Sequence, residues 1–213
     1  MTKKLWQASL NQKKNSILFA FENHISKKFN KNFNNNYQKL LEWSIKNSPE
    51  FWSSFWDFSE IKGKKGDKKI KRSKVFYKDL FLPNSKLNFA ENLLSKNNDE
   101  KAITFISENG FREERTWSKL NENTNKITQF LKSIRINQKD RVVAYMPNTI
   151  ETVEAFIATT SIGAIWSSCS PDFGVKGVIE RFSQIKPKVL FITDQYFYNG
   201  KKINILERLP EIL

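Results

Sequence analysis

Residues 142–175 read VVAYMPNTIETVEAFIATTSIGAIWSSCSPDFGV, and they carry the pattern that decides the fold. Short apolar runs in and after this stretch alternate with segments of helical spacing. Such alternation is typical of βαβ units, in which the strands are parallel and the crossovers right-handed. We therefore predict an α/β fold built on a parallel βαβαβ unit. Its strands are residues 142–146, 165–169 and 189–193, and its helices are residues 149–162 and 175–186.

Upstream of this unit, two alternating segments, Ala102–Ser107 and Phe111–Trp117, flank Glu108-Asn109-Gly110. An Asn-Gly pair tolerates the positive φ angles of tight turns, so these residues predict a β-hairpin. A helix is then predicted to start near Thr116 or Ser118. Its predicted buried face consists of Leu120, Ile127, Phe130, Leu131 and Ile134.

The first 60 residues are predicted to form a helical extension. Apolar side chains recur at helical spacing in residues 18–29 and, less regularly, in residues 40–45. Ser48-Pro49-Glu50 predicts a third helix with a capping hydroxyl, proline at the first helical position and an acid in the first turn. We interpret its aromatic stripe as part of the core or as a docking face. The alternative is a platform on which nucleic-acid bases stack. The stripe consists of Phe51, Trp52, Phe55 and Trp56.

Residues 62–78 form the basic segment, KGKKGDKKIKRSKVFYK, in which Asp67 is the single acid. Its two glycines and low apolar content predict a mobile, solvated loop that connects the helical extension to the next unit. The other interpretation is a contact surface for a polyanion.

Length and composition exclude several classes of protein. A chain of 213 residues with 39% hydrophobic side chains can bury a core and fits one domain with an extension. No apolar run approaches the roughly 20 residues that span a bilayer, and the first residues lack a secretory signal, so we expect a cytoplasmic protein without a membrane partner. One cysteine and one histidine exclude an intrachain disulfide and a His/Cys metal site, and we predict no metal ligand.

The formal charge of +14 raises the alternative of nucleic-acid binding. Only seven of the 36 basic residues are Arg, the residue suited to bidentate phosphate and base recognition. Lysine occurs with many Asn, Ile and Phe residues, which indicates a compositional bias of the whole chain. We therefore expect no specific nucleic-acid partner.

In open parallel sheets, ligands bind beyond the carboxyl ends of the strands, here after Met146, Cys169 and Thr193. Asn148 is interpreted as a cap of the following helix and Asp172 as a turn or cap residue that accepts backbone N–H groups. Cys169 lacks a histidine base nearby in the sequence and is interpreted as a buried structural thiol. In the loop after the third strand, a lysine that follows Gly200 could meet a phosphate.

Several stretches support a family resemblance. Residues 161–175 closely resemble acetoacetyl-CoA synthetases, members of the adenylate-forming acyl-CoA ligase superfamily. The further stretches that agree are residues 87–94, 140–142, 145–148 and 181–190. The resemblance covers essentially the whole chain, but only the N-terminal part of such an enzyme. It implies a helical N-terminal extension over residues 1–96 and the start of the AMP-binding domain over residues 97–213.

The resemblance also implies a mechanism. Enzymes of this family use ATP and Mg²⁺ to convert acetoacetate to an acyl-adenylate, and then transfer the acyl group to CoA. By position, the turn that lies along CoA falls on Ser170, Pro171 and Asp172, and the pair near the CoA ribose phosphate falls on Tyr198 and Lys201. This sequence departs from the related acetyl-CoA synthetases in two ways. The turn contains no glycine, and Tyr198 stands where a charged side chain is expected.

No residue of this chain is predicted to be catalytic, because the family's phosphate loop, ribose-binding acid, hinge and catalytic lysine lie downstream. Residues 159–163 look like a phosphate loop but lack its lysine and are interpreted as a helix end. We therefore expect a truncated ligase that is inactive by itself, binds no cofactor tightly and lacks its C-terminal remainder. The alternatives are a fragment of another short-chain acyl-CoA synthetase, a piece that complements a separate chain, and a non-catalytic polyanion-binding module.

Overall fold

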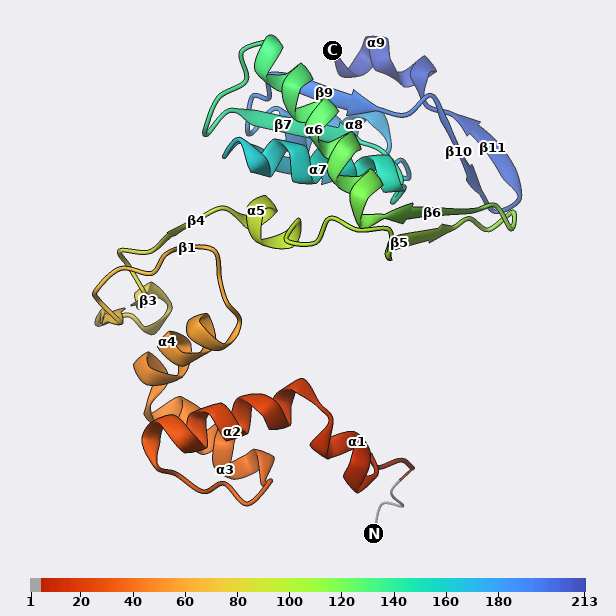
Figure 1. Cartoon of the computed structure of the whole chain (residues 1–213). Helices are drawn as coiled ribbons and strands as arrows, with labels where there is room; N and C mark the ends of the chain where they lie inside the picture. Colours follow the sequence, from red (N-terminus) through yellow and green to blue (C-terminus); the bar gives the residue numbers. More distant parts are fainter. Residues whose placement is uncertain (1–4) are drawn as a thin grey trace. The chain divides into compact units, whose positions relative to one another are not determined.

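The structure, a computed structural model, describes residues 5–213 (Figure 1). Its contacts divide the chain into an N-terminal unit that ends at Leu87 and a C-terminal unit that begins at Asn88. The C-terminal unit contains the whole of the predicted βαβαβ segment. The domain boundary expected between residues 96 and 97 stays a prediction.

Helices dominate the N-terminal unit over residues 5–60. These helices are α1 (Leu10–Lys14), α2 (Ile17–Phe29), α3 (Tyr37–Lys46) and α4 (Ser48–Phe58). Ser9, Ser16 and Asn36 precede the first three, and each side chain accepts a hydrogen bond from the backbone N–H three residues later. These caps supply partners for N–H groups that have none inside a helix, which explains where the helices begin.

The start of α4 differs from the prediction. Ser48 is the first helical residue and not the cap, which is Asn47, and no side chain caps this end. Asn47 also ends α3, and its side chain donates to the carbonyl of Trp43 at 3.0 Å. Because one residue serves both helices, no extended residue remains for a hydroxyl cap. The Ser48 hydroxyl instead accepts a hydrogen bond from Arg72 at 3.3 Å.

Aromatic rings form the core of the N-terminal unit. Phe21 of α2 is buried, and its ring lies 5.6 Å from that of Phe51 and 5.0 Å from that of Phe58. The stripe on α4 is therefore partly core, as we favoured. Trp52 and Phe55 are each 42% exposed, although the ring centroid of Phe55 lies 5.7 Å from that of Phe21.

The basic segment forms strands that pair with the residues that follow it. Strand β1 (Gly63–Lys64) pairs with β4 (Lys86–Leu87), and β2 (Ile70–Lys71) pairs with β3 (Leu80–Phe81), with a 3-10 turn η1 (Phe76–Lys78) between. Its ion pairs include Lys65–Asp57 at 2.5 Å, Lys69–Glu50 at 3.5 Å and Arg72–Asp79 at 2.7 Å. The backbone of the four strand residues and part of the charge thus have partners outside the segment, while most of its residues are exposed, as a solvated connection predicts. The mobility of the segment stays a prediction.

The C-terminal unit begins with α5 (Phe89–Leu93) and the predicted hairpin of β5 (Lys101–Ile106) and β6 (Arg112–Thr116). Gly110 has φ 82° in the hairpin turn, as the Asn-Gly signal predicted. Helix α6 (Trp117–Ser133) follows, and the Thr116 side chain caps it. The predicted hairpin and helix are confirmed.

A parallel sheet of strand order β8-β7-β9 forms the centre of the C-terminal unit. Its strands are β7 (Arg141–Tyr145), β8 (Ile165–Cys169) and β9 (Val189–Ile192), and the crossovers are α7 (Ile150–Ser161) and α8 (Val175–Phe182). The predicted βαβαβ unit is confirmed. Because β7 is the middle strand, its backbone has partners on both sides.

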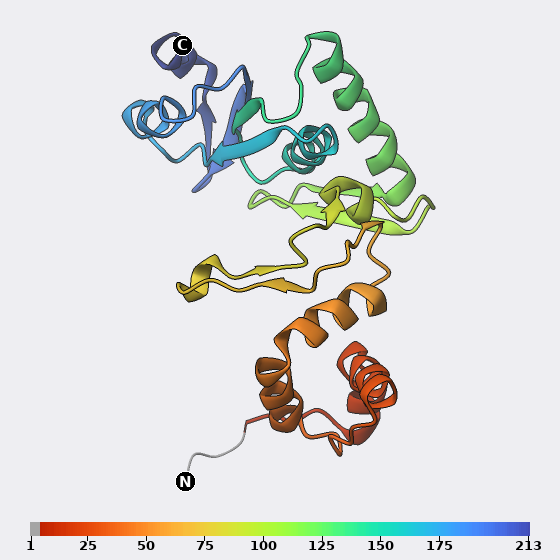
Figure 2. The ribbon, with the colours of Figure 1, turned by 90° about the vertical axis from the view of Figure 1, so that its left-hand side faces the viewer.

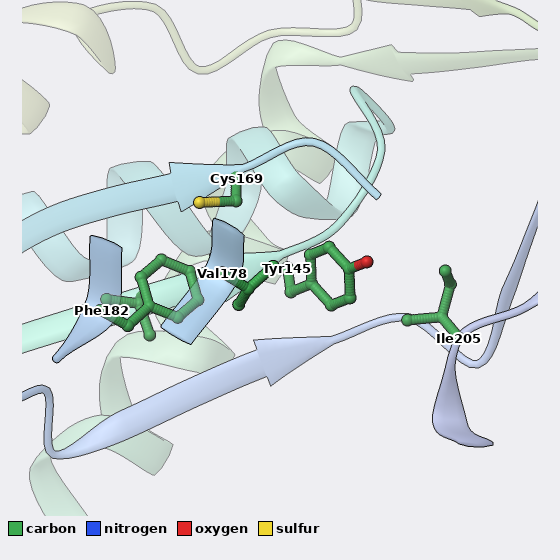
Figure 3. Packing of buried hydrophobic residues seen from close by; sticks show 6 residues of the cluster. Tyr145, Cys169, Val178, Phe182 and Ile205 are labelled. Atoms are coloured by element: carbon green, nitrogen blue, oxygen red, sulfur yellow. The ribbon is translucent and has the colours of Figure 1, made fainter. Parts of the chain in front are cut away.

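Both faces of this sheet are covered. Val143 and Tyr145 point to one face, where they join Val178 and Phe182 of α8 (Figure 3). Val142 points to the other, where it packs with Leu131 of α6 and Ala158 of α7. Figure 2 shows α8 on one side of the sheet and these two helices on the other. Burial on both faces explains why β7 reads as a continuous apolar run.

The predicted buried face of α6 is only partly correct. Leu120 and Leu131 are buried, but Phe130 is 52% exposed and Ile134 is 44% exposed. Helix α6 packs mainly against α7, and its buried positions are Leu120, Thr124, Thr128 and Leu131. Apolar spacing alone did not separate Phe130 and Ile134 from the core.

A second hairpin follows the parallel sheet, and the sequence reasoning missed it. Strand β10 (Gln195–Tyr198) pairs with β11 (Lys201–Asn204) across the turn Asn199-Gly200, where both residues have positive φ. The chain then continues as η2 (Leu206–Arg208) and α9 (Leu209–Ile212). The Asn-Gly signal was present here as in the first hairpin.

Candidate functional site

A cavity of about 250 Å³ lies beyond the carboxyl ends of β7 and β8. Its walls come from residues 146–148 after β7, residues 168–172 at the end of β8, and residues 196–198 of β10. This is the edge of the sheet at which open parallel folds bind ligands. The missed hairpin therefore supplies one whole wall of the cavity.

Four of the five predicted site residues line this cavity, namely Ser170, Pro171, Asp172 and Tyr198. Lys201 does not line it. In the antiparallel register, however, Lys201 is the direct partner of Tyr198, so the two side chains leave the same face of the hairpin. The structure thus brings four predicted residues together and places the fifth beside them.

Hydrogen bonds shape the turn after β8. The N–H of Phe173 donates to the carbonyl of Ser170 at 3.1 Å, which closes the turn. The Asp172 carboxylate accepts one hydrogen bond from the Ser170 hydroxyl at 2.9 Å and one from the Tyr196 hydroxyl at 2.8 Å. Asp172 is therefore a turn residue, but it accepts hydroxyl groups and not the backbone N–H groups that we expected. Helix α8 is capped by Gly174 without a side-chain bond.

Tyr196 is a site residue that sequence reasoning missed. Burial and then the hydrogen bond to the Asp172 carboxylate raise the pKa of Tyr196 to about 12. Both causes favour the neutral phenol, because ionisation would place two anions in contact. Tyr196 is therefore a hydrogen-bond donor that holds Asp172 in place, and not a base.

Two further residues that we did not predict hold the turn after β8 without lining the cavity. The Tyr145 hydroxyl lies 2.6 Å from the carbonyl oxygen of Phe173 and 3.0 Å from that of Pro171. Arg208 Nη1 reaches the Tyr145 hydroxyl at 2.6 Å and the Pro171 carbonyl at 3.0 Å. The turn after β8 is thus held from below by side chains of β7 and η2. Nothing in the local sequence links Tyr145 to Arg208.

The hairpin that carries Tyr198 is anchored through its turn. The Glu108 carboxylate, in the turn of the first hairpin, accepts hydrogen bonds from the N–H groups of Asn199 at 3.0 Å and Gly200 at 2.9 Å. The positive φ angles of the turn point two consecutive N–H groups in one direction, which suits an anion. Glu108 therefore joins the two hairpins of the C-terminal unit.

Asn148 lines the cavity, but it does not cap α7. The cap position is Thr149, which makes no side-chain cap bond. The Thr152 hydroxyl donates to the Pro147 carbonyl at 2.6 Å and ties the first turn of α7 to the end of β7. Residue 148 is thereby left outside the helix start and beside the cavity.

Cys169 is a structural thiol, as predicted. It is 3% exposed, and burial raises the pKa of the thiol, which disfavours the reactive thiolate. Residues 159–163 form the end of α7, and the Thr159 hydroxyl bonds to the carbonyl of Ala155 inside the helix. The interpretation of this stretch as a helix end is confirmed.

Residues 5–213 contain neither a cluster of metal-binding side chains nor a helix able to cross a membrane. Within this range, no three His, Cys, Asp or Glu side chains gather closely enough to hold a metal ion. None of the helices there combines the length and the apolar character that a membrane crossing needs.

Comparison with known proteins identifies the family. The sequence pattern of the AMP-binding enzymes matches residues 90–212, which contain the sheet, the cavity and the second hairpin. The chain belongs to the AMP-binding enzyme family. The match includes every residue that lines the cavity.

Two of the individual relatives are acetoacetyl-CoA synthetases. Over 201 residues, the chain is 36% identical to the acetoacetyl-coenzyme A synthetase of Rhizobium meliloti. This match covers 94% of this chain and 31% of that protein. Over 182 residues, it is 41% identical to the acetoacetyl-CoA synthetase of Xenopus tropicalis. This match covers 84% of this chain and 27% of that protein.

The structure is also similar to a solved one. The acetoacetyl-CoA synthetase from Streptomyces lividans matches with a TM-score of 0.91 and 26% sequence identity, over 99% of this chain and 33% of that one. The chain thus spans about a third of the length of the relatives it matches. Both the sequence and the fold resemble the N-terminal part of these ligases.

Proposed function

We propose that this chain supplies the CoA-facing portion of an ATP-dependent acid–thiol ligase that converts acetoacetate and CoA to acetoacetyl-CoA through an acyl-adenylate. The observation that carries the proposal is the cavity at the carboxyl edge of the sheet. Its walls combine the turn after β8 with strand β10, the two segments that the family resemblance assigns to CoA. The acetoacetyl-CoA synthetases named above support the choice of substrate.

In this proposal, the turn at Ser170, Pro171 and Asp172 borders the thiol-bearing arm of CoA. The hydrogen bonds of Asp172 to Ser170 and Tyr196 hold that turn in one conformation before the ligand arrives. A turn that is already ordered loses less conformational entropy when the ligand binds, which favours affinity.

Tyr198 and Lys201 border the ribose phosphate of CoA in this proposal. They are direct partners across the β10–β11 register, so a hydroxyl and an ammonium group meet the same phosphate. Lys201 supplies a positive charge. Tyr198 supplies a hydroxyl donor at the position where the related acetyl-CoA synthetases carry a charged side chain. Lys202 pairs with Phe197 and leaves the opposite face of the hairpin.

ATP and Mg²⁺ are required by the complete enzyme in this proposal, and this chain does not supply their sites. No cluster of metal-binding side chains occurs within residues 5–213, and the family's phosphate loop lies downstream. Adenylate formation needs groups that stabilise charge on the transferring phosphate. We therefore expect the 213-residue chain by itself to release no pyrophosphate when it is given acetoacetate and ATP.

The experiment is a titration of the chain with CoA and with dephospho-CoA, followed by NMR. We expect millimolar binding of CoA, and weaker binding by about two- to fivefold in Lys201→Ala, because exposed charge pairs contribute little. Dephospho-CoA should bind both proteins equally. Lys202→Ala is the matched control and should leave CoA affinity unchanged. Absence of CoA binding by the unmodified chain, or equal losses in both variants, would contradict the proposal.

A further inference from the structure

We propose that Tyr145 and Arg208 act as a positioning pair, which sets the place of the turn at residues 170–173 from the side opposite the cavity. The pair consists of the last residue of β7 and the last residue of η2. It does not line the cavity. Its consequence for ligand binding rests on the proposed function, because it assumes that this turn borders CoA.

A count of donors shows how the pair works. The Tyr145 hydroxyl has one hydrogen, and its shortest contact is the carbonyl of Phe173 at 2.6 Å. Arg208 Nη1 has two hydrogens, which match the Tyr145 hydroxyl oxygen at 2.6 Å and the Pro171 carbonyl at 3.0 Å. Three hydrogens thus meet three acceptors, and two of these acceptors are carbonyl groups of the turn.

The surroundings give these bonds their strength. Tyr145 is fully buried, and Arg208 is half-buried. Within residues 5–213, Arg208 forms no ion pair with a carboxylate, so its charge is directed at neutral oxygens. Hydrogen bonds from a charged donor are stronger than neutral ones, and an unsatisfied buried carbonyl is costly. The turn is therefore placed by contacts from residues far away in the sequence.

The carbonyl groups and the side chains of the turn make different contacts. Carbonyl groups on the inner side bind the positioning pair, and the side chains of Ser170 and Asp172 reach the cavity. Loss of the inner bonds leaves the Tyr196–Asp172 hydrogen bond and the contact of Arg181 with the Phe173 ring to hold the turn against its neighbours. We expect the turn to move away from the sheet in such a variant, while the parallel strands remain paired.

Cys169 provides a direct probe of this movement. It is the single cysteine, it is 3% exposed, and it immediately precedes the turn. A turn that opens exposes the thiol to a disulfide reagent such as Ellman's reagent. The rate of modification therefore measures turn opening without any reference to ligand.

The variants are Arg208→Met, Tyr145→Phe and Arg208→Lys, with Arg141→Met as the matched control. Arg141 also donates to two loop carbonyl groups, those of Ile185 at 2.8 Å and Lys186 at 3.1 Å, but at the opposite end of β7. Arg208→Met should speed Cys169 modification by about tenfold or more, and Tyr145→Phe by somewhat less, because two charge-assisted bonds are lost in the first. Arg208→Lys keeps a charged donor and should restore part of the protection.

Each protein is also titrated with CoA, and its fold is checked by circular dichroism. Arg208→Met should bind CoA more weakly than Arg141→Met does. Equal modification rates in Arg208→Met and Arg141→Met would overturn the positioning pair, as would an unchanged rate in Arg208→Met. If Arg208→Met does not fold, the comparison of Tyr145→Phe and Arg208→Lys with the control decides in the same way. Absence of CoA binding by the unmodified chain would overturn the proposed function but not the positioning pair, because the rates of Cys169 modification test the pair without CoA.

Discussion

The two units of this chain are held together in different ways. In the N-terminal unit, helices meet through aromatic rings around Phe21, and the strands are two residues long. In the C-terminal unit, strand β7 pairs on both sides, and residues 142–145 are fully buried. Aromatic packing joins helices without directing them to one edge, whereas parallel strands end together. Strands that end together explain why polar groups converge on the cavity beyond the carboxyl ends of β7 and β8.

The ion pairs of the two units also differ. Asp57 in the N-terminal unit is 42% exposed where it meets Lys28 and Lys65. In the C-terminal unit, Glu154 of α7 is 4% exposed and meets Arg115 of β6 at 3.1 Å. Exposed ion pairs contribute little to stability, whereas removal of one partner of a buried pair leaves a charge without compensation. Of these ion pairs, the Arg115–Glu154 pair of the C-terminal unit is therefore the one expected to affect stability most.

The largest effect is expected from the aromatic core. Phe21→Ala should lower the free energy of unfolding by about 3–5 kcal/mol, because it removes a buried ring and leaves a cavity. Phe55→Ala is the control, since Phe55 touches Phe21 but is 42% exposed, and it should cost much less. The measurement is denaturant unfolding combined with hydrogen exchange in residues 17–58. Equal losses in the two variants would show that this unit does not depend on its central ring.

The second effect concerns the buried ion pair. Arg115→Met should cost about 3 kcal/mol of unfolding free energy, because Glu154 would remain buried with only the Asn123 amide as its partner. Lys101→Met removes an exposed ion pair with Glu114 from the same hairpin and should have little measurable effect. Denaturant titration at neutral pH compares the two. Similar values for both would remove the contrast between the units.

A third, smaller effect depends on pH. The pKa of Tyr196 is raised from 10.0 to about 12 in the folded chain. The folded state therefore keeps a proton that the unfolded state releases, so this contribution is complete below pH 10 and is lost as the pH rises toward 12. In Tyr196→Phe, the fall in stability over this interval should be shallower than in the unmodified chain. Parallel curves of denaturation midpoint against pH would contradict the hydrogen bond to Asp172.

The smallest effect on stability is expected from the basic segment. Lys64, Lys68, Lys71, Lys74 and Lys78 lie outside its ion pairs and are exposed. Their replacement by Gln should leave the thermal midpoint almost unchanged and reduce the retention of DNA or RNA at low salt. At about 150 mM salt, where the Debye length is about 8 Å, the unmodified chain should retain neither. Tight, sequence-selective retention at that salt would favour a nucleic-acid function for this segment.

Predictions from the local sequence pattern were correct for helices and strands whose bounds depend only on the residues within them or next to them. The strands after residue 140 and the helices between them follow from apolar spacing, and α6 begins at the Thr116 cap as its sequence indicates. Three cap assignments, at Ser48, Asn148 and Asp172, failed or changed partners. At Ser48 and Asp172, a group from another element took the position or the hydrogen bond, so the local sequence held only half of the information. At Asn148, the cap position is the next residue, Thr149.

The sequence by itself determined the parallel βαβαβ unit, the first hairpin and the family, because these depend on periodicity and short motifs that neighbouring residues complete. Only the tertiary structure decided the cavity wall of β10, the joining of the hairpins by Glu108, and the placement of the turn by Tyr145 and Arg208. Their partners are 63 and 91 residues apart in the chain. A hydrogen bond over such a separation forms only after the sheet has aligned both strands and hairpins, so no local pattern specifies it.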